Sequence, residues 1–326
     1  MKLVIQIPCL NEEQTLPAVL REIPKKIKGV DSIEVVVIDD GCSDKTVEVA
    51  KAHGVRHIVH HSQKQGLARS FRDGLMASLA LDADIIVNTD GDNQYPSTYI
   101  PALIAPILDK KADIVIGNRQ TDTIDHFSPT KKRLQKLGTR VLNAAAGTNV
   151  PDAPSGFRAY SRDAAIRLNV VTNFSYAMET LIQAGRKGLA IGHVPIRVNP
   201  KTRESRLFRS TPSYLAKSGV AIGRAFVMYR PYVIFVSLGI LLFVAGTIPF
   251  ARFLYFFFAD HVHGLRHIQS LLIGSVLLTA SFISFTLGIV ADLIRINRVL
   301  IEESLEQEKR LRFDIDRLAA FKARRK

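Results

Sequence analysis

The stretch ADIIVNTDGDNQYP, residues 83 to 96, joins an apolar run to a cluster of polar residues, and a helical pattern over residues 97–110 follows it. Helical patterns also separate four other short apolar runs, which lie at residues 3–7, 33–39, 56–61 and 113–117. These helical patterns span residues 12–27, 44–53 and 66–81. Strands that alternate with helices are typical of a parallel sheet covered on both faces. The sequence therefore predicts an α/β domain with a mostly parallel sheet.

Polar clusters follow four of the predicted strands: PCLNEE, DDGCSDKT, NTDGDNQ and GNR. The carboxyl ends of parallel strands share one edge of a sheet, where such folds bind ligands. Two nucleotide sites are excluded, because the chain has neither G-x-G-x-x-G after its first strand nor G-x-x-x-x-G-K-[ST]. The second cluster offers the carboxylates of Asp39 and Asp40 instead. Carboxylates suit the hydrogen-bond donors of a base or a ribose better than they suit phosphates.

Asp90, Asp92 and Gln94 follow the fourth strand at alternate positions. In extended backbone, alternate side chains point the same way, so we expect these three on one face. Mg²⁺ and Mn²⁺ prefer oxygen ligands and take the remaining ones from water and a substrate diphosphate. The spacing favours a divalent metal site, and a simple turn after a strand is the alternative, since it uses the same residue types.

Two long apolar segments lie between residues 233 and 291, separated by the polar loop DHVHGLRH. Each reaches the length of about 20 residues that the hydrocarbon core of a bilayer requires. Buried helices of a soluble protein rarely run this long with so little charge. The sequence therefore predicts a two-helix hairpin across a membrane.

The formal net charge of +14 is unevenly placed. The loop between the apolar segments carries only Arg266, whereas basic residues gather before the first segment and after the second: Lys201, Arg203, Arg206, Arg209, Lys217, Arg224, Arg230, Arg295 and Arg298. Cytoplasmic flanks of membrane spans show this bias. We expect an integral protein of the cell (inner) membrane with its large domain and both termini in the cytoplasm, and no nucleic-acid partner.

Two further segments flank the predicted hairpin. Residues 207–231 place Leu215 and Phe226 opposite Lys217 and Arg224, the pattern of an amphipathic helix at the membrane interface. Residues 293–326 keep apolar side chains at helical spacing among mixed charges. Such a tail is either a helix packed on its own domain or a helix that mediates oligomers. We favour the second interpretation and expect a homo-oligomer.

Six segments, in order, resemble the successive motifs of family 2 glycosyltransferases with the GT-A fold: IPCLNEE, VIDDGCSDKT, QGLARSFRDGL, NTDGDNQYP, VIGNR and DAPSGFRAYSR. With DGDNQYP and SGFR together, the chain is most similar to the branch of dolichyl-phosphate mannosyltransferases and bacterial polyprenyl-phosphate glycosyltransferases. The resemblance covers about residues 3–206. It implies a UDP- or GDP-sugar donor, Mg²⁺ or Mn²⁺, undecaprenyl or dolichyl phosphate as acceptor, and inversion at the sugar carbon.

We therefore expect four parts along the chain. A GT-A domain occupies residues 1–206, an amphipathic interfacial helix residues 207–231, a transmembrane hairpin residues 232–292 and a charged helical tail residues 293–326.

The resemblance also assigns roles on the donor side. Pro8, Glu12 and Asp39 correspond to residues that hold the nucleoside, and Asp90 joins them on the donor side. Asp92 acts with the metal in catalysis.

On the acceptor side, the resemblance marks Asp152 as catalytic and Arg119 as the phosphate-binding arginine. A phosphomonoester has a second pKa of about 6, so a lipid phosphate is largely ionised at neutral pH without a general base. Asp152 then either accepts a residual proton or orients the phosphate. The basic run Lys131, Lys132 and Arg133 either faces the lipid phosphate or forms a solvated face.

Arg206 is assigned to the acceptor phosphate as well. It lies in PKTRESR, where many relatives carry R-x-x-G-x-S-[KR]. Pro200 and Arg203 replace the Arg and Gly of that pattern, so this loop departs from the family.

Two other functions remain open. A processive polysaccharide synthase resembles Q-x-x-R-W and usually has more spans, and this chain contains no tryptophan. The second alternative is a non-catalytic membrane scaffold with a nucleotide-sugar fold. The presence of Asp90, Asp92 and Asp152 argues against it. No motif identifies the sugar or separates undecaprenyl from dolichyl phosphate.

Overall fold

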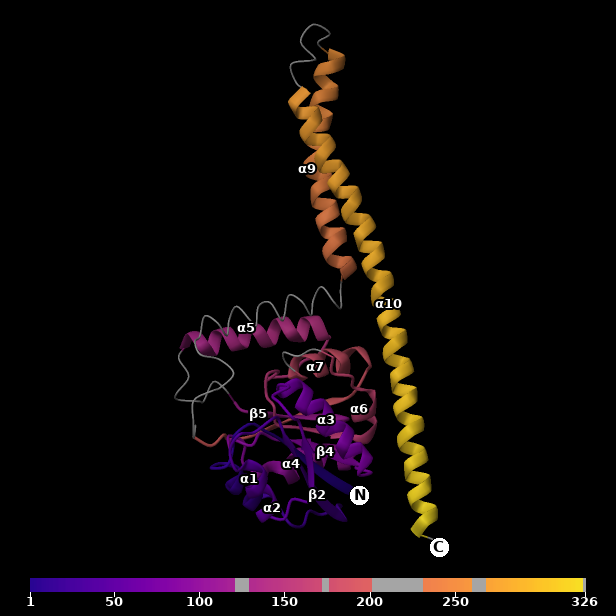
Figure 1. The fold of residues 1–326 in the computed structure, drawn as a ribbon. Coiled ribbons are helices and arrows are strands. Elements are labelled where there is room, and N and C mark those ends of the chain that lie inside the picture. The colour runs from indigo at the N-terminus through magenta and orange to yellow at the C-terminus, as the bar shows by residue number, and fades with distance from the viewer. Residues whose placement is uncertain (121–128, 172–175, 201–230, 260–267, 325–326) are drawn as a thin grey trace. The chain divides into compact units, whose positions relative to one another are not determined.

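The computed structural model describes residues 1–120, 129–171, 176–200, 231–259 and 268–324 (Figure 1). The chain divides into two compact units. The first comprises Met1–Ile222 with Ser304–Lys326, and the second comprises Gly223–Glu303. Arg206 and residues 207–230, most of the predicted interfacial helix, lie outside the described residues.

Among the described residues, a seven-stranded sheet of order β3-β2-β1-β4-β6-β5-β7 forms the centre of the first unit. Its strands span Lys2–Cys9 (β1), Ser32–Asp39 (β2), His57–His60 (β3), Ile85–Asn88 (β4), Ile114–Asn118 (β5), Arg158–Ser161 (β6) and Ile191–Pro195 (β7). Neighbouring strands pair in parallel, except that β6 pairs antiparallel with β4 and β5.

Runs of β-branched residues account for the central strands, because such side chains favour extended backbone. Residues 35–38 of β2 read VVVI, and residues 85–87 of β4 read IIV. Residues 3–9 of β1 are all buried, as expected for a strand covered on both faces. The predicted α/β class and mostly parallel sheet are confirmed.

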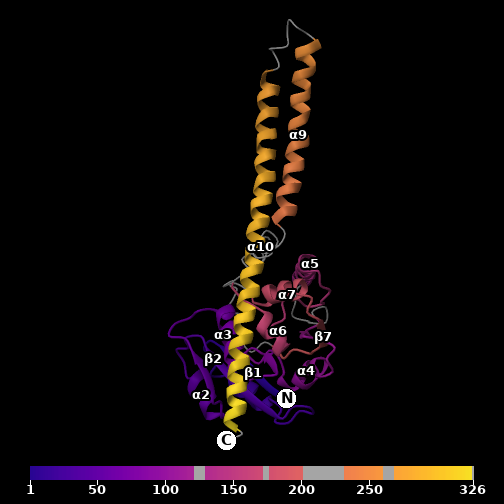
Figure 2. The same cartoon turned by 90° about the vertical axis from the view of Figure 1, so that its right-hand side faces the viewer.

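Helices cover both faces of this sheet (Figure 1 and Figure 2). They span Leu16–Glu22 (α1), Thr46–Ala52 (α2), Leu67–Ala80 (α3), Ile100–Leu108 (α4), Pro129–Ala146 (α5), Arg162–Arg167 (α6) and Tyr176–Arg186 (α7). In α3, Gly74 lies against the side chain of Gln6 in β1. In α4, Leu103 belongs to the core cluster that contains Ile5 and Ile7 of β1. Since successive strand residues point to opposite faces, α3 and α4 cover opposite faces of the sheet.

The strands β6 and β7 were not predicted, and the sequence of β6, RAYS, carries no apolar run and begins with an arginine. Strand β6 lies between β4 and β5 and runs against both. An antiparallel strand begins at the edge where its parallel neighbours end. The preceding segment DAPSGF, residues 152–157, therefore reaches the carboxyl edge of the sheet.

The second unit contains two long apolar helices. These are α9, which spans Pro231–Ala259, and part of α10, which spans Ile268–Arg324. The segments Tyr232–Ala259 and Ile268–Ile315 are long and apolar enough to cross a membrane.

Small residues bring α9 and α10 close together. A Cβ atom on Gly246 of α9 would lie 2.9 Å from the Cβ of Leu277 in α10. The hydroxyl of Ser281 donates a hydrogen bond of 2.8 Å to the carbonyl of Gly239 across the pair. Close glycine contacts and interhelical hydroxyl bonds are typical of helix pairs in membranes.

The last part of α10 belongs to the first unit and packs on its own domain. Phe313 is buried, and Lys309 donates hydrogen bonds to the carbonyl of Leu168 and to Oδ1 of Asn169, at 2.8 and 2.6 Å. Of the two arrangements considered for the tail, the structure has the helix packed on its own domain. A homo-oligomer stays a prediction.

Candidate active site

The carboxyl ends of β1, β2 and β4 meet at one edge of the sheet. Cys9 of β1 pairs with Asp39 of β2, and Gln6 pairs with Asn88 of β4. The ends of these strands and the loops that follow them carry the side chains predicted for the donor: Pro8, Glu12, Asp39 and Asp90. Pro8 is buried at the end of β1, and Glu12 and Asp39 are only 5% and 1% exposed. The predicted convergence of the polar clusters is confirmed.

The loop that carries Asp90, Asp92 and Gln94 is not extended, so the backbone geometry from which the single face was predicted is wrong. Asn93 has a φ of 56°, and the main-chain N–H of Gln94 donates a hydrogen bond of 3.0 Å to Oδ1 of Asp92. This Asx turn reverses the chain. Asn199, which follows β7, fixes the turn by donating from its main-chain N–H to the carbonyl of Gln94, at 3.0 Å.

Two glycines let this loop lie close to its neighbours. A Cβ on the buried Gly91 would lie 2.9 Å from Sγ of Cys9 and 3.2 Å from Cγ of Glu12. A Cβ on Gly156 would lie 2.8 Å from the hydroxyl of Tyr176 and 3.3 Å from Oδ2 of Asp90. The segment before β6 is thus packed directly against Asp90.

Asn88, Tyr95 and Tyr176 join these segments, and the sequence did not single them out. Asn88 donates through Nδ2 to the carbonyl of Gly156 and to the hydroxyl of Tyr176, at 2.9 and 3.0 Å. The main-chain N–H of Gly156 donates to the hydroxyl of Tyr95, at 3.3 Å. Burial, and then the nearby Asp90 carboxylate, raise the pKa of Tyr176 well above its ordinary value. The sequence alone does not distinguish tyrosines such as Tyr95 and Tyr176 from aromatic residues of the hydrophobic core.

Arg119 and Asp152 form one unit, although the sequence assigned them separate roles. Nε and Nη2 of Arg119 donate to Oδ2 and Oδ1 of Asp152 at 2.7 and 2.8 Å, and the main-chain N–H adds a bond of 3.1 Å. The side chain of Asp152 is 1% exposed and that of Arg119 is 12% exposed. A carboxylate that accepts from three donors of one arginine fixes the plane and direction of the guanidinium.

The pair lies in the same neighbourhood as Asp90. Burial raises the pKa of Tyr95, while the charge of Arg119 opposes the rise and the carboxylates of Asp90 and Asp152 add to it. The phenol of Tyr95 is therefore within electrostatic range of all three groups. A fixed cation and the loop of carboxylates share one end of the sheet.

Asp39 is held in its ionised form. Burial acts to raise its pKa, but hydrogen bonds from Cys42 and the neighbouring His60 outweigh this, and the pKa of Asp39 is lowered. The main-chain N–H of Cys42 lies 2.7 Å from Oδ1, and Nδ1 of His60 lies 2.6 Å from Oδ2. The side chain of His60 is 68% exposed, so His60 lies between the buried Asp39 carboxylate and solvent.

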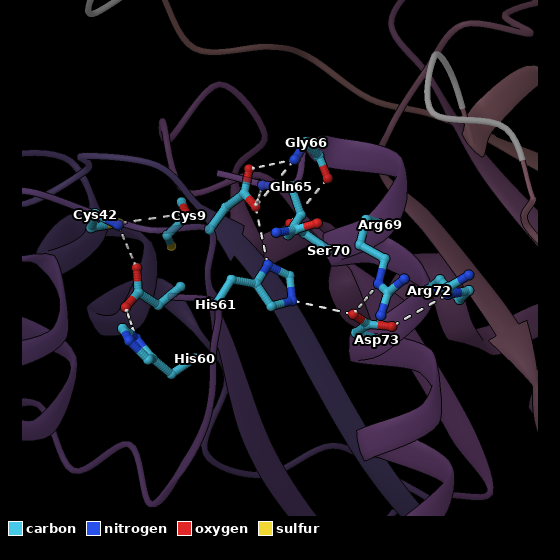
Figure 3. A network of polar contacts seen from close by, with 12 residues as sticks. Cys9, Cys42, His60, His61, Gln65, Gly66, Arg69, Ser70, Arg72 and Asp73 are labelled. Carbon is cyan, nitrogen blue, oxygen red and sulfur yellow. Dashed lines mark hydrogen bonds and ion pairs between the residues drawn. The ribbon is translucent and has the colours of Figure 1, made fainter. Parts of the chain in front are cut away.

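Asp40 has a different, internal role. Its carboxylate accepts hydrogen bonds from the main-chain N–H groups of Gln65 and Gly66, at 2.7 and 2.9 Å, which fixes the start of α3. His61 lies between Asp40 and Asp73, with Nδ1 and Nε2 at 3.0 and 3.2 Å from the two carboxylates (Figure 3). Asp40 therefore has a structural role, since it holds the loop before α3 in place.

Several predicted acceptor residues are not located in detail. Lys131, Lys132 and Arg133 lie in the first turns of α5, and their side chains are outside the described residues, as is Arg206. The choice between a solvated face and a phosphate-binding face for this run stays open.

A metal site built from protein ligands alone does not fit the described residues, which contain no group of three or more His, Cys, Asp or Glu arranged around a cation. Asp90 and Asp92 offer two partly exposed carboxylates instead. Mg²⁺ usually binds through one or two carboxylates and takes its other ligands from water and phosphates. The pair fits a cation that is shared with a substrate diphosphate.

Comparison with known proteins places these motifs in a family. Residues 4–168 match the profile of Glycosyl transferase family 2. The dolichyl-phosphate hexose transferase of Haloferax volcanii is 31% identical over 229 residues, which cover 69% of this chain and 92% of that protein. The undecaprenyl-phosphate mannosyltransferase of Micrococcus luteus is 26% identical over 206 residues, which cover 60% of this chain and 83% of that protein.

Solved structures agree on the fold. The glucosyl-3-phosphoglycerate synthase from Mycobacterium tuberculosis, in complex with Mn²⁺, UDP-glucose and phosphoglyceric acid, has a TM-score of 0.55 at 22% identity. The likeness covers 69% of this chain and 78% of that chain, and at this identity it concerns the fold alone. It confirms the predicted GT-A class. Because the family profile matches residues 4–168, about half of the chain, this protein belongs to glycosyl transferase family 2.

Proposed function

We propose that this protein is an inverting hexosyltransferase that moves a sugar from a nucleotide-sugar donor to a polyprenyl phosphate at the cytoplasmic face of a membrane. One observation carries the proposal: a buried carboxylate, Asp152, fixes Arg119 beside the carboxylate loop of Asp90 and Asp92. In this proposal two sites for phosphate would lie together, a metal-type site for a diphosphate and an arginine for a monophosphate. The two relatives named above are a dolichyl-phosphate hexose transferase and an undecaprenyl-phosphate mannosyltransferase, which supports this assignment.

On the donor side, Pro8, Glu12 and Asp39 would hold the nucleoside of a UDP- or GDP-sugar. The ionised Asp39 is suited to N–H or O–H donors of a base or ribose. Asp90, Asp92 and Gln94 would hold Mg²⁺ or Mn²⁺, with the main-chain N–H of Gln94 bonded to Oδ1 of Asp92. When bound, the cation neutralises the charge that develops on the departing nucleoside diphosphate.

On the acceptor side, Arg119 would bind the ionised phosphate of the lipid. A phosphate oxygen attacks the anomeric carbon, the bond from that carbon to the diphosphate oxygen breaks, and the nucleoside diphosphate leaves with the electron pair. Attack from the face opposite the leaving group inverts the configuration. Because the acceptor is already ionised, Asp152 serves by orienting Arg119 and accepts no proton.

The membrane placement follows from the two apolar helices and their basic flanks. The segments Tyr232–Ala259 and Ile268–Ile315 contain the proposed spans, which we place within residues 232–292. The catalytic domain and both termini would face the cytoplasm. Residues 207–231 would lie at headgroup depth, where a polyprenyl phosphate presents its charge.

Purified protein in lipid nanodiscs, given a panel of UDP- and GDP-sugars with undecaprenyl or dolichyl phosphate, tests the proposal. We expect a lipid-linked sugar with one donor of the panel, formed only with Mg²⁺ or Mn²⁺ and lost in a chelator. Transfer to 3-phosphoglycerate in place of the lipid would refute the lipid acceptor. Donor binding without transfer to any acceptor would favour the non-catalytic scaffold, and a polymeric product would favour a polysaccharide synthase.

A further inference from the structure

Arg158 lies at the start of β6 and is fully buried, with 1% of its surface exposed. Its guanidinium donates four hydrogen bonds: to the carbonyls of Ala153, Ser155 and Ala177 at 2.6, 2.8 and 2.9 Å, and to the hydroxyl of Thr180 at 3.0 Å. All four acceptors are neutral. In the described part of the chain, no carboxylate forms an ion pair with this arginine.

A buried cation loses its hydration, so the fold must satisfy its donors. The planar guanidinium can reach two chain segments at once, which a lysine ammonium on a single stem does not reproduce. Ala153 and Ser155 belong to the loop before β6, whereas Ala177 and Thr180 belong to α7. Arg158 therefore fastens the loop from Asp152 to Gly156 onto α7.

This loop carries two parts of the candidate active site. Asp152 at its start forms the ion pair with Arg119, and Gly156 at its end is hydrogen-bonded to Tyr95 and Asn88. Ala153, the residue after Asp152, is a direct partner of Arg158. A shift of the Ala153 carbonyl therefore shifts the carboxylate of Asp152 and the guanidinium that it holds. Misplacement by about 1 Å is enough to cost about 100-fold in an enzymatic rate.

We propose that Arg158 is a positioning residue for sugar transfer: it fixes the Asp152–Gly156 loop, so that Asp152 holds Arg119 in the orientation that receives the acceptor phosphate. Arg158 contacts no substrate and acts through Arg119. The role rests on the proposed function for the identity of the acceptor.

Arg158→Lys tests this role, because it keeps the charge and loses the fork. We expect the KM for polyprenyl phosphate to rise about 10-fold, while the Kd of the nucleotide sugar, measured by calorimetry, changes by less than about twofold. In an Arg119→Ala background, the same substitution should change the KM by less than about twofold, since the residue that it positions is gone. Arg162→Lys is the matched control. Arg162 directly follows β6, is largely buried and donates to the carbonyl of Ala83 at 3.2 Å. Because Ala83 lies outside the Asp152–Gly156 loop, this substitution should leave the KM for polyprenyl phosphate and the Kd of the nucleotide sugar unchanged.

Thr180→Val supplies a second test if Arg158→Lys does not fold, since it removes one acceptor of the guanidinium without changing the size of the side chain. We expect a rise of about threefold in the same KM. An unchanged KM, equal losses of donor and acceptor binding, or an additive loss in the Arg119→Ala background would each overturn the role of Arg158 in an active enzyme. A wild-type protein that transfers sugar to no polyprenyl phosphate would instead overturn the proposed function, and this role with it.

Discussion

Arg119 and Asp152 form a two-pronged ion pair, in which Nε and Nη2 of the arginine lie 2.7 and 2.8 Å from the two carboxylate oxygens. The parallel fork holds the guanidinium in one plane and direction. With its side chain 1% exposed, Asp152 has little access to solvent or substrate. Asp152 therefore fixes the orientation of Arg119, and Arg119 is the partly exposed member of the pair.

The first prediction concerns Arg119. Loss of a charge-assisted contact to a phosphate costs about 1.5–3 kcal/mol, so Arg119→Ala should raise the KM for polyprenyl phosphate by about 10- to 100-fold. Arg119→Lys should recover only part, because a point charge replaces a planar fork. Asp152→Asn keeps the arginine but weakens its partner, and should raise the same KM by less. Donor affinity measured by calorimetry should stay unchanged, and its loss would move Arg119 to the donor site.

The second prediction concerns the metal. Asp92→Asn removes one anionic oxygen from the partly exposed loop, so most of the turnover should be lost while the fold stays intact. Circular dichroism and the melting temperature check the fold, and turnover is measured across a range of Mg²⁺ and Mn²⁺ concentrations. Asp44→Asn is a poor control because Asp44 accepts a hydrogen bond from the main-chain N–H of Thr46, whereas Asp109→Asn changes an exposed carboxylate that pairs with Lys111. Undiminished turnover in Asp92→Asn would rule out a metal ligand at this position.

Local pattern predicted most of the sheet, because runs such as VVVI and IIV favour extended backbone whatever surrounds them. The strand β6 escaped prediction for a physical reason. Its first side chain, Arg158, is buried because carbonyls of the preceding loop and of α7 accept its donors. Such satisfaction depends on the tertiary fold, and no local pattern records it.

The site shows the same division. Carboxylates at strand ends predicted the edge that carries Asp39 and Asp90. The extended backbone predicted for Asp90, Asp92 and Gln94 is wrong, because Asp92 accepts the N–H of Gln94 and the chain turns. The pairing of Arg119 with Asp152 joins residues 33 positions apart and follows from the antiparallel insertion of β6, which sequence spacing does not encode.

The third prediction concerns pH and Asp39. Its pKa is lowered below the ordinary 3.8 in the folded protein. A carboxyl of this kind stabilises the fold at pH values above its unfolded pKa and loses that contribution as the pH falls through its folded pKa. The melting temperature of the wild type should exceed that of Asp39→Asn from about pH 5 to 7, and the difference should shrink below about pH 4.

Asp109→Asn is the matched control for that series. Asp109 is 58% exposed on its side chain and pairs only with the exposed Lys111 among the described residues, so its substitution should leave the melting temperature nearly unchanged at each pH. A difference between wild type and Asp39→Asn that persists at the acid end would show that the Asp39 carboxylate is not stabilised by the fold.

The fourth prediction concerns topology. Basic residues lie before the first apolar segment and after the second, which would place these two flanks in the cytoplasm and the loop between the segments outside the cell. A cysteine at Gly264, in that loop, should therefore react with an impermeant thiol reagent applied to intact cells. A cysteine at Ala319 should react only after the membrane is opened. The parent protein, with Cys9 and Cys42, gives the background. The reverse labelling pattern would place the catalytic domain outside the cell.

The fifth prediction tests how closely the loop before β6 is packed on Asp90. A methyl group on Gly156 would meet the hydroxyl of Tyr176 at 2.8 Å and Oδ2 of Asp90 at 3.3 Å. Tyr176 is buried and hydrogen-bonded to Asn88, so it has little room to move. Overpacking of this kind typically costs about 1–3 kcal/mol, and Gly156→Ala should lower the melting temperature and reduce turnover by displacing Asp90.

Gly138 offers a matched substitution in the same domain. It lies within α5, where a Cβ would have no heavy atom within 4 Å, so the added methyl meets open space. Replacing a helical glycine by alanine stabilises a helix by up to about 1 kcal/mol, and Gly138→Ala should raise the melting temperature slightly and leave turnover unchanged. If Gly156→Ala behaved like Gly138→Ala, the segment before β6 would not be packed against Asp90. If instead Gly156→Ala lost turnover with an unchanged melting temperature, the added methyl would act on the position of Asp90 alone, which ties this loop to the donor site as well as to Arg119.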